Sequence, residues 1–310
     1  MNIYTHTSNY PKQKSVITIG TFDGVHIGHR KILEKITHSA KDLNCDSIVL
    51  TFFPHPRMVL QENSSIKLLN TMEEKGKLLQ KIGIDNLIIH PFDKEFSQLS
   101  AEEFVKKVLV EQLQIQKIII GYDHRFGRNR TADINDLIVF GEKYDFEVEQ
   151  ISAQEIDDIA ISSTKIRTAL AEGTISLANE YLGYNYFFSG TVIKGNQLGR
   201  TIGFPTANIQ IKEDYKLIPK NGVYIVKSYL QEELIYGMMN IGNRPTVNGT
   251  NQTIEVHFLN FNEDLYGQEI TIELLEFIRD EQKFDSLNAL KNQIQKDKEY
   301  CIKYLHNPTL

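Results

Sequence analysis

The stretch Thr18-Ile19-Gly20-Thr21-Phe22-Asp23-Gly24-Val25-His26-Ile27-Gly28-His29 decides how the first half of the chain folds. Residues 15–21 form a short, apolar run rich in β-branched side chains, which predicts a buried strand. After the stretch, apolar residues recur at helical spacing, at Ile32, Leu33, Ile36, Ala40 and Leu43. The stretch is therefore predicted to be a turn that leads from a strand into a helix.

Two histidines, His26 and His29, lie where this predicted helix begins. A helix N-terminus has unpaired backbone N–H groups and the positive end of the helix dipole, so it attracts anions. Gly24 and Gly28 permit a tight turn and a close approach of the backbone to a ligand. Donors clustered where negative charge develops suit phosphoryl or nucleotidyl transfer. The alternative is that the histidines only cap the helix or lie on its surface.

The composition places the chain among ordinary globular proteins. Its 310 residues are enough for two domains, with 41% hydrophobic and 24% charged residues. The net charge of −6 argues against nucleic acid as the main partner. No leader segment and no run of membrane-spanning length is seen, so no membrane partner is expected. Cys45 and Cys301 are far apart, which fits a reducing cytoplasm better than a disulfide framework.

Residues 15–152 alternate between predicted strands and predicted helices. We expect strands at 15–21, 47–53, 86–90, 117–121 and 146–151, and helices after the histidine turn and at 72–82, 100–112 and 133–144. This alternation predicts a parallel sheet with helices on both faces. In such sheets ligands bind beyond the carboxyl ends of the strands.

Polar residues follow several of these strand ends. Pro54-His55-Pro56 follows the second strand, although two prolines beside a histidine can simply mark a turn. The loop 121–128 mixes aromatic residues with arginines, which suits a flat ring and a phosphate; a solvated loop is the alternative. Farther on, Lys165 and Arg167 lie in the first turn of a predicted helix, 163–173, that Ser163 or Thr164 would cap. Cations there oppose the helix dipole, and a bound triphosphate would explain them.

The pattern changes after a second helix at 175–182. We expect strands at 186–194, 206–211, 222–230, 234–241, 253–259 and 269–275 with no helices between them, then a helix at 286–305. Many short strands at regular spacing predict a small antiparallel barrel. The predicted domains are therefore 1–183 and 184–310.

A glycine-rich loop opens this second domain. Gly195, Gly199 and Gly203 could form a backbone nest for phosphates, or they could be a flexible hairpin loop. Thr206 and Asn208 follow at once, and their oxygens are hard ligands suited to Mg²⁺. Glu255 alternates with apolar neighbours along a predicted strand, so it is either surface-facing or a base in the mouth of the barrel.

These strings, taken in order, resemble the bacterial bifunctional riboflavin kinase/FAD synthetases, whose second activity is FMN adenylyltransferase. They are His26-Ile27-Gly28-His29, Pro54-His55-Pro56, Gly121-Tyr122-Asp123-His124-Arg125-Phe126-Gly127, Ile161-Ser162-Ser163-Thr164-Lys165-Ile166-Arg167 and Gly203-Phe204-Pro205-Thr206-Ala207-Asn208. The resemblance also reaches residues 243–246 and 279–284, and it covers roughly residues 15–300. It implies an α/β nucleotidyltransferase domain with a Rossmann-like parallel sheet, followed by an all-β barrel with a C-terminal helix.

The resemblance implies that ATP phosphorylates riboflavin to FMN and then adenylylates FMN to FAD, with Mg²⁺ as the metal. It implies catalytic roles for His26, His29 and Glu255, and a metal site at Thr206 and Asn208. Nucleotide binding falls to Gly20, Phe22, Asp23, Gly28, Ser163, Thr164, Lys165, Arg167, Gly195, Gly199 and Gly203. Flavin binding falls to Pro54, His55, Tyr122, Asp123, Phe126 and Arg279.

The chain departs from the family pattern at two positions. Many members have an acidic residue where Phe53 stands, and position 124 is commonly Phe rather than His.

Two other functions are compatible with parts of the pattern. One is a nucleotidyltransferase for another acceptor with a β accessory domain, which the Gly203–Asn208 string speaks against. The other is a non-catalytic flavin or nucleotide sensor, which the intact histidines, Thr206, Asn208 and Glu255 speak against.

Overall fold

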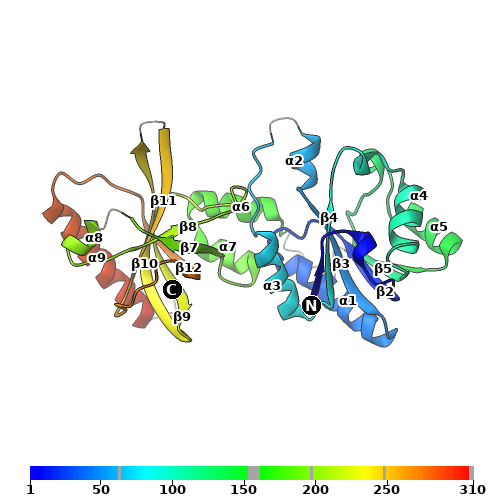
Figure 1. Cartoon of the computed structure of the whole chain (residues 1–310), viewed down its shortest axis with the longest axis horizontal. Coiled ribbons are helices and arrows are strands. Elements are labelled where there is room, and N and C mark those ends of the chain that lie inside the picture. The colour runs from blue at the N-terminus through cyan, green and yellow to red at the C-terminus, as the bar shows by residue number, and fades with distance from the viewer. Residues whose placement is uncertain (62–63, 153–160, 196–197, 247–248, 307–310) are drawn as a thin grey trace. The chain divides into compact units, whose positions relative to one another are not determined.

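The computed structural model describes residues 1–61, 64–152, 161–195, 198–246 and 249–306. Contacts divide the chain into two compact units, Met1–Ser163 and Thr164–Leu310 (Figure 1). We call them the N-terminal unit and the C-terminal unit. The predicted domain boundary lies 20 residues further on, at Gly183, so the two helices before that residue group with the C-terminal unit.

A six-stranded parallel sheet forms the centre of the N-terminal unit, in the order β1-β4-β3-β2-β5-β6. All five residues of β2 are buried, which explains its apolar, β-branched sequence. The strands are β1 (Asn2–Tyr4), β2 (Ser15–Ile19), β3 (Asp46–Phe53), β4 (Asn86–Pro91), β5 (Ile115–Gly121) and β6 (Glu147–Ile151). Five of them were predicted, whereas β1, a short edge strand, was not.

The order of the strands fixes where a ligand would bind. From β2 the chain builds β3 and β4 on one side and then returns to add β5 and β6 on the other. The carboxyl ends of β2 and β5 therefore flank the point where the strand order reverses, which is where such sheets bind ligands. The histidine turn follows β2 and the loop 121–128 follows β5, so both predicted strings lie at this point.

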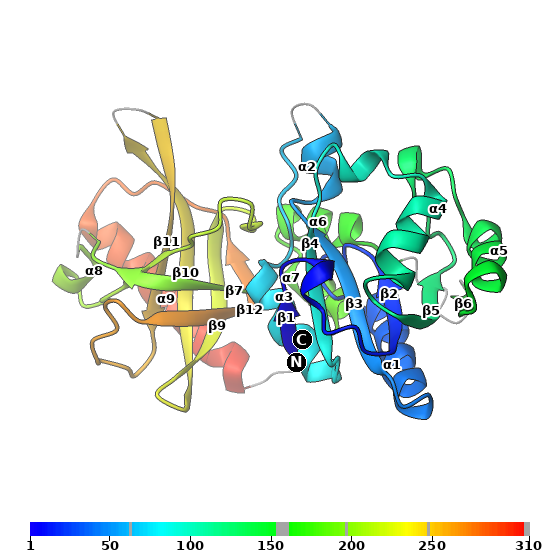
Figure 2. The same cartoon turned by 45° about the vertical axis from the view of Figure 1, so that its right-hand side comes forward.

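Helices cover both faces of the sheet (Figure 2). α1 (Ile27–Asp42) and α3 (Met72–Ile82) contact each other, while the helical segment after β4 packs with α5 (Ile134–Tyr144) on a separate core. That segment is α4 (Ala101–Phe104), which continues as a π-helix over Val105–Val110. The helices expected from residues 100 and 133 each begin at a capping residue, since the Ser100 side chain accepts the Glu103 N–H and the Asp133 side chain accepts the Asn135 N–H.

The C-terminal unit is a closed antiparallel barrel in the order β10-β11-β8-β7-β12-β9. Its strands are β7 (Phe187–Ile193), β8 (Ala207–Gln210), β9 (Gly222–Leu230), β10 (Glu233–Thr246), β11 (Gly249–Phe258) and β12 (Glu269–Arg279). A short helix, α8 (Leu198–Thr201), lies in the glycine loop, and α9 (Leu287–His306) closes the chain. The predicted barrel and C-terminal helix are confirmed, and α8 was not predicted.

Two helices pack against the barrel at its N-terminal side. α6 (Ser163–Glu172) is joined to the barrel by a hydrogen bond from the Lys220 N–H to the Leu170 carbonyl at 3.0 Å. α7 (Ile175–Leu182) is joined by Asn179, whose amide donates to the Leu274 carbonyl at 2.9 Å and accepts the Tyr186 N–H at 2.7 Å. Among the described residues, no helix combines the length and apolarity needed to cross a membrane.

Candidate active sites

The turn between β2 and α1 adopts an unusual backbone conformation. Phe22, Gly24 and Val25 all have positive φ angles, of 43°, 89° and 39°. Such angles are free of cost only for glycine and are unfavourable for a β-branched residue such as Val25. The surrounding structure must therefore hold the turn in place.

Donors from three other segments supply that support. Asp23 accepts the Leu69 N–H on its carboxylate at 2.9 Å, and its carbonyl accepts the Ser163 hydroxyl at 2.8 Å. The Thr21 carbonyl accepts the Lys75 ammonium at 2.6 Å and the Thr51 hydroxyl at 3.3 Å. Ser163, predicted to bind nucleotide, thus contacts the histidine turn through Asp23 and does not cap its own helix with this bond.

His26 and His29 lie together at the start of α1. Their rings stack with centroids 3.6 Å apart and planes 20° apart, and the Phe22 ring meets His29 edge-on at 5.1 Å. His26 is the N-cap residue, but its side chain makes no capping hydrogen bond within the described structure. The Nδ1 atoms of both rings are buried and have no hydrogen-bond partner among the described residues. Helix capping therefore does not explain these histidines.

Both imidazoles are neutral at physiological pH. Burial lowers the pKa of His26 to about 4. Burial also lowers the pKa of His29 well below its usual value, and the nearby charges of His26 and Lys75 add to this effect. Each neutral ring carries one N–H and one acceptor nitrogen, so the pair can donate hydrogen bonds without exchanging protons.

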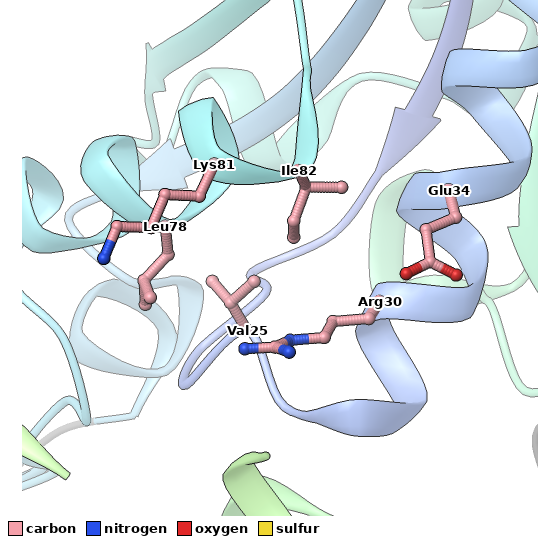
Figure 3. Close-up of a pocket in the computed structure, with 6 residues that line it drawn as sticks. All are labelled: Val25, Arg30, Glu34, Leu78, Lys81 and Ile82. Atoms are coloured by element: carbon pink, nitrogen blue, oxygen red, sulfur yellow. The ribbon is translucent and has the colours of Figure 1, made fainter. Parts of the chain in front are cut away.

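Beside this turn lies a cavity of about 360 Å³ between α1 and α3 (Figure 3). Figure 3 shows Arg30 reaching from α1 toward Val25 and Leu78, with Glu34 one turn further along the same helix. Neither histidine lines this cavity, whose walls are Val25, Arg30, Glu34, Leu78, Lys81 and Ile82. Because it holds one carboxylate beside its two cations, its lining does not resemble a phosphate site.

The predicted flavin residues of the N-terminal unit lie in different environments. His55 caps the short helix α2 (Pro56–Leu60), since its Nδ1 accepts the Arg57 N–H at 3.1 Å. Phe126 is buried in the core beside Phe104, while Tyr122 is 55% exposed. Pro54 and Asp123 are also exposed. A turn-forming role for His55 and a core role for Phe126 thus have direct structural support, and flavin binding by this group stays a prediction.

The other predicted nucleotide-binding residues divide between the two units. Gly20 and Gly28 belong to the histidine turn and its helix, in the N-terminal unit. Thr164, Lys165 and Arg167 lie on α6 in the C-terminal unit, where Thr164 and Lys165 are exposed and Arg167 is half-buried. Their nucleotide contacts remain predictions.

The barrel brings together the residues predicted for the second site. The Thr206 hydroxyl donates to the Glu255 carboxylate at 3.1 Å, and Glu255 pairs with Asn208 across β11 and β8. A methyl group on Gly195 would overlap the Asn208 amide, and one on Gly199 would overlap the Phe204 carbonyl. Gly203 instead needs its left-handed φ of 88°. The three glycines therefore permit a close fold around Thr206, Asn208 and Glu255.

Two residues of these sites were not predicted from sequence. His257 lies two residues after Glu255 on β11, and its Nδ1 bonds the Pro205 carbonyl at 2.8 Å, which fixes the backbone next to Thr206. Residues two apart on a strand share a face, so the sequence could have placed His257 beside Glu255. Lys75 lies with Leu78 and Leu79 on the buried stripe of α3. A lysine at an apolar position of a helix was the available signal there.

Arg279, predicted to bind flavin, is engaged within the C-terminal unit. Its guanidinium donates from Nε and Nη2 to the carboxylate of Asp297 on α9, at 2.7–3.1 Å. Asp297 is buried, with 4% of its surface exposed. The pair joins β12 to α9, and a flavin contact for Arg279 stays a prediction.

Comparisons with known proteins agree with the two-part architecture. The family model for FAD synthetase matches residues 8–165, and the family model for riboflavin kinase matches residues 182–305. The segment 166–181 between them holds most of α6 and α7, and a functional boundary at Gly183 stays a prediction.

Curated relatives match nearly the whole chain. The bifunctional riboflavin kinase/FMN adenylyltransferase of Buchnera aphidicola subsp. Schizaphis graminum is 40% identical over 305 residues, covering 97% of each chain. The Escherichia coli (strain K12) protein of the same name is 38% identical over 291 residues, covering 94% of this chain and 92% of its own. A crystal structure described as a macrolide-efflux protein from Streptococcus pneumoniae has a TM-score of 0.86 at 30% identity, over 96% of this chain and 97% of its own. The chain belongs to the family of bifunctional riboflavin kinase/FMN adenylyltransferases.

Proposed function

We propose that this chain catalyses two successive transfers from ATP, and that each half carries out one of them. The residues matched by the riboflavin kinase model move the γ-phosphoryl group of ATP to riboflavin, which gives FMN and ADP. The residues matched by the FAD synthetase model move AMP from a second ATP to FMN, which gives FAD and pyrophosphate. The observation that carries the proposal is that each half gathers its own set of reactive residues, the stacked histidines in one and the Thr206–Asn208–Glu255 group in the other.

In the adenylylation site, the start of α1 receives the reacting phosphate. The phosphate of FMN is already an anion, so its attack on the α-phosphorus needs no general base. His26 and His29 are neutral, and they donate hydrogen bonds to the oxygens on which charge develops. Lys165 and Arg167 hold the outer phosphates that leave as pyrophosphate, a role that rests on the resemblance alone.

In the kinase site, Glu255 takes the proton of the ribityl 5′-hydroxyl as that oxygen attacks the γ-phosphorus. The hydrogen bond from Thr206 orients the carboxylate, and the His257 contact with Pro205 fixes the backbone that presents Thr206. The glycine loop covers the triphosphate. Positioning and charge neutralisation supply most of the rate acceleration in such transfers.

We propose Mg²⁺ as the metal of both reactions, held on the kinase side by Thr206 and Asn208. Hydroxyl and amide oxygens suit this hard cation, which usually keeps few protein ligands and shares the rest with substrate phosphates. The side-chain amide of Asn208 lies close to Gly195 of the glycine loop, the loop proposed to cover the triphosphate. A metal held by Asn208 would therefore lie beside the phosphates of the nucleotide. Within the described ranges, no group of three or more His, Cys, Asp or Glu residues offers an all-protein site. Mg²⁺ would neutralise charge on the triphosphate.

A reciprocal pair of variants tests the division of labour. His29→Ala removes a donor to the developing charge, so FAD formation from FMN should fall by about 10²–10³-fold. Glu255→Gln keeps the shape of the side chain and removes the base, so FMN formation should fall by about 10²–10⁴-fold. Both rates are measured in each variant, by separating the flavins after incubation with ATP and magnesium.

Each variant is the control for the other. His29→Ala should still phosphorylate riboflavin at the normal rate, and Glu255→Gln should still convert supplied FMN to FAD. Parallel loss of both activities in either variant would contradict separate sites. A wild-type protein that returned riboflavin unchanged would be a sensor, the remaining rival.

The two free cysteines, Cys45 and Cys301, are compatible with the cytoplasm as the working compartment.

A further inference from the structure

Lys75 is a buried lysine that no step of the proposed reactions uses. It lies on α3 with 2% of its surface exposed, and its ammonium donates to the Thr21 carbonyl at 2.6 Å. Lysine is among the residues least often buried, because removing an ammonium from water is costly unless it is paired. Such a position therefore needs an explanation.

The surroundings of Lys75 connect it to the histidine turn. Burial lowers the pKa of Lys75 to about 8, and the nearby carboxylate of Asp23 opposes that effect. In turn, the charge of Lys75 helps to hold the pKa of His29 low. The other buried carboxylate beside it, that of Glu74, is engaged in capping α3, where it accepts the Thr71 N–H at 2.9 Å.

The Thr21 carbonyl to which Lys75 donates begins the strained part of the turn. Phe22, Gly24 and Val25, with their positive φ angles, separate this carbonyl from His26. A donor that fixes Thr21 thus fixes the entrance to the segment that places both histidines. The positive charge of the Lys75 ammonium would also attract phosphates bound at the start of α1.

We infer that Lys75 is a positioning residue for FMN adenylylation: its ammonium holds the Thr21 carbonyl and so sets the left-handed turn that places His26 and His29. This inference rests on the function proposed for the N-terminal unit. A purely structural lysine would behave differently. Removal of Lys75 leaves the Thr21 carbonyl without this donor and can itself lower stability, so the two roles are separated by the kcat and the pH dependence of FAD formation, measured on folded protein.

The first test is Lys75→Met in the full-length protein. FAD formation from FMN should fall by about 10–100-fold in kcat, with a smaller change in KM for ATP, because misplaced reacting groups chiefly slow the chemical step. Riboflavin phosphorylation should stay within about twofold, and the rates are compared at a temperature where circular dichroism shows the variant to be folded, because the Thr21 carbonyl loses this donor. The matched control is Lys77→Met on the same helix, where Lys77 is exposed and forms an ion pair with Glu73 at 2.7 Å.

The second test is the pH dependence of the wild-type protein. The kcat/KM of FAD formation should decline above about pH 8, as the ammonium loses its proton, while riboflavin phosphorylation does not follow that decline. Unfolding cannot cause this loss through Lys75. Its pKa is lower in the folded than in the unfolded protein, so stability rises with pH between about 8 and 10.5. In Lys75→Met the decline near pH 8 should be absent.

Three results would overturn the inference. One is wild-type FAD formation that keeps a constant kcat/KM from pH 7 to pH 9.5, which decides the matter even if Lys75→Met fails to fold. Another is a folded Lys75→Met that makes FAD within about twofold of the wild-type rate. The third is an alkaline decline that persists unchanged in that variant. If His29→Ala abolishes FAD formation and Lys75→Met does not, the positioning role fails and the proposed function stands; if neither variant affects FAD formation, the proposed site itself fails.

Discussion

Several histidines of the N-terminal unit are held neutral by burial. The pKa values of His26, His90 and His124 are each lowered to about 4, with burial as the largest cause. In the unfolded chain a histidine has a pKa near 6.5. Between about pH 6.5 and pH 4 the unfolded state therefore binds more protons than the folded state, and stability falls as the pH falls through this window.

His124 allows this effect to be measured at one residue. Its ring lies nearly parallel to that of Phe126, with centroids 6.1 Å apart, and its buried Nε2 has no hydrogen-bond partner among the described residues. Because the family commonly has Phe here, His124→Phe should keep the packing and remove the titration. The variant should lose about 2 kcal/mol less stability than wild type between pH 7.5 and pH 5.

The measurement is thermal inactivation at the two pH values, read as FAD-forming activity after return to pH 7.5. His124→Gln is the matched control for packing, since it removes the titration but not the polarity. Both variants should show the weaker pH dependence, and only the Phe variant should match wild type at pH 7.5. Equal pH dependence in all three proteins would contradict a His124 that stays neutral in the folded protein.

Residues that belong to short local strings could be predicted from sequence. The position of His26 and His29 at a helix start follows from the strand before them and the helix after them. Thr206 and Glu255 are 49 residues apart and were grouped only through the family resemblance, and the structure joins them by a hydrogen bond. Lys75 and His257 could not be predicted in the same way. Their partners Thr21 and Pro205 lie 54 and 52 residues away, so only the fold reveals the contact.

At the scale of elements, one buried ion pair joins α9 to the barrel. Arg279 ends β12, and its guanidinium contacts Asp297, which also accepts the side-chain amide of Gln293 at 2.9 Å. The side chains of the pair are only 17% and 5% exposed. Removal of one partner of a buried pair leaves the other charge uncompensated, whereas joint replacement by apolar residues is often tolerated.

We therefore expect Asp297→Asn to destabilise the C-terminal unit by about 3–5 kcal/mol. The double variant Arg279→Met with Asp297→Leu should recover most of that stability. The readout is riboflavin phosphorylation after incubation of the full-length protein in increasing urea. If Arg279 instead serves mainly to bind flavin, Asp297→Asn will leave the urea midpoint unchanged, and the double variant will raise the KM for riboflavin.

Elements with clear end signals were predicted well. The helix predicted at 72–82 has the bounds Met72–Ile82, because Thr71 caps its start and left-handed Gly83 ends it. The π-helical end of the segment after Ser100, and the short elements β1, α2 and α8, were not predicted. Three to five residues are too few to show a periodicity, and a π-turn depends on packing that a local pattern does not record.

At the scale of the whole molecule, α6 and α7 pack with one half of the chain, while residues of α6 are predicted to serve the reaction of the other half. They fold with the barrel, since Leu170 and Asn179 bond Lys220, Leu274 and Tyr186 of the C-terminal unit. The sequence, however, assigns Lys165 and Arg167 of α6 to adenylylation. The change from alternating to all-β pattern at Gly183 could be predicted from sequence, but the packing of these helices could not.

Because α6 packs with the barrel but carries residues predicted for adenylylation, the point at which the chain is divided should change the activity of the fragments. Residues 164–310 should fold and make FMN from riboflavin, because the barrel keeps the helices that cover it. Residues 184–310 lack the Asn179 and Leu170 bonds and bury less apolar surface, so they should make FMN with a lower urea midpoint. Residues 1–183 should form FAD from supplied FMN, and residues 1–163, which lack Lys165 and Arg167, should do so far more slowly.

Each fragment is first checked for folding by circular dichroism and then assayed with riboflavin and with FMN. A folded 1–163 fragment that forms FAD as fast as 1–183 would show that α6 is dispensable for adenylylation and would remove Lys165 and Arg167 from the site. Equal urea midpoints for 164–310 and 184–310 would show that α6 and α7 add nothing to the barrel. FAD made from riboflavin by either C-terminal fragment would contradict the assignment of adenylylation to the N-terminal half, because neither fragment contains His26 or His29.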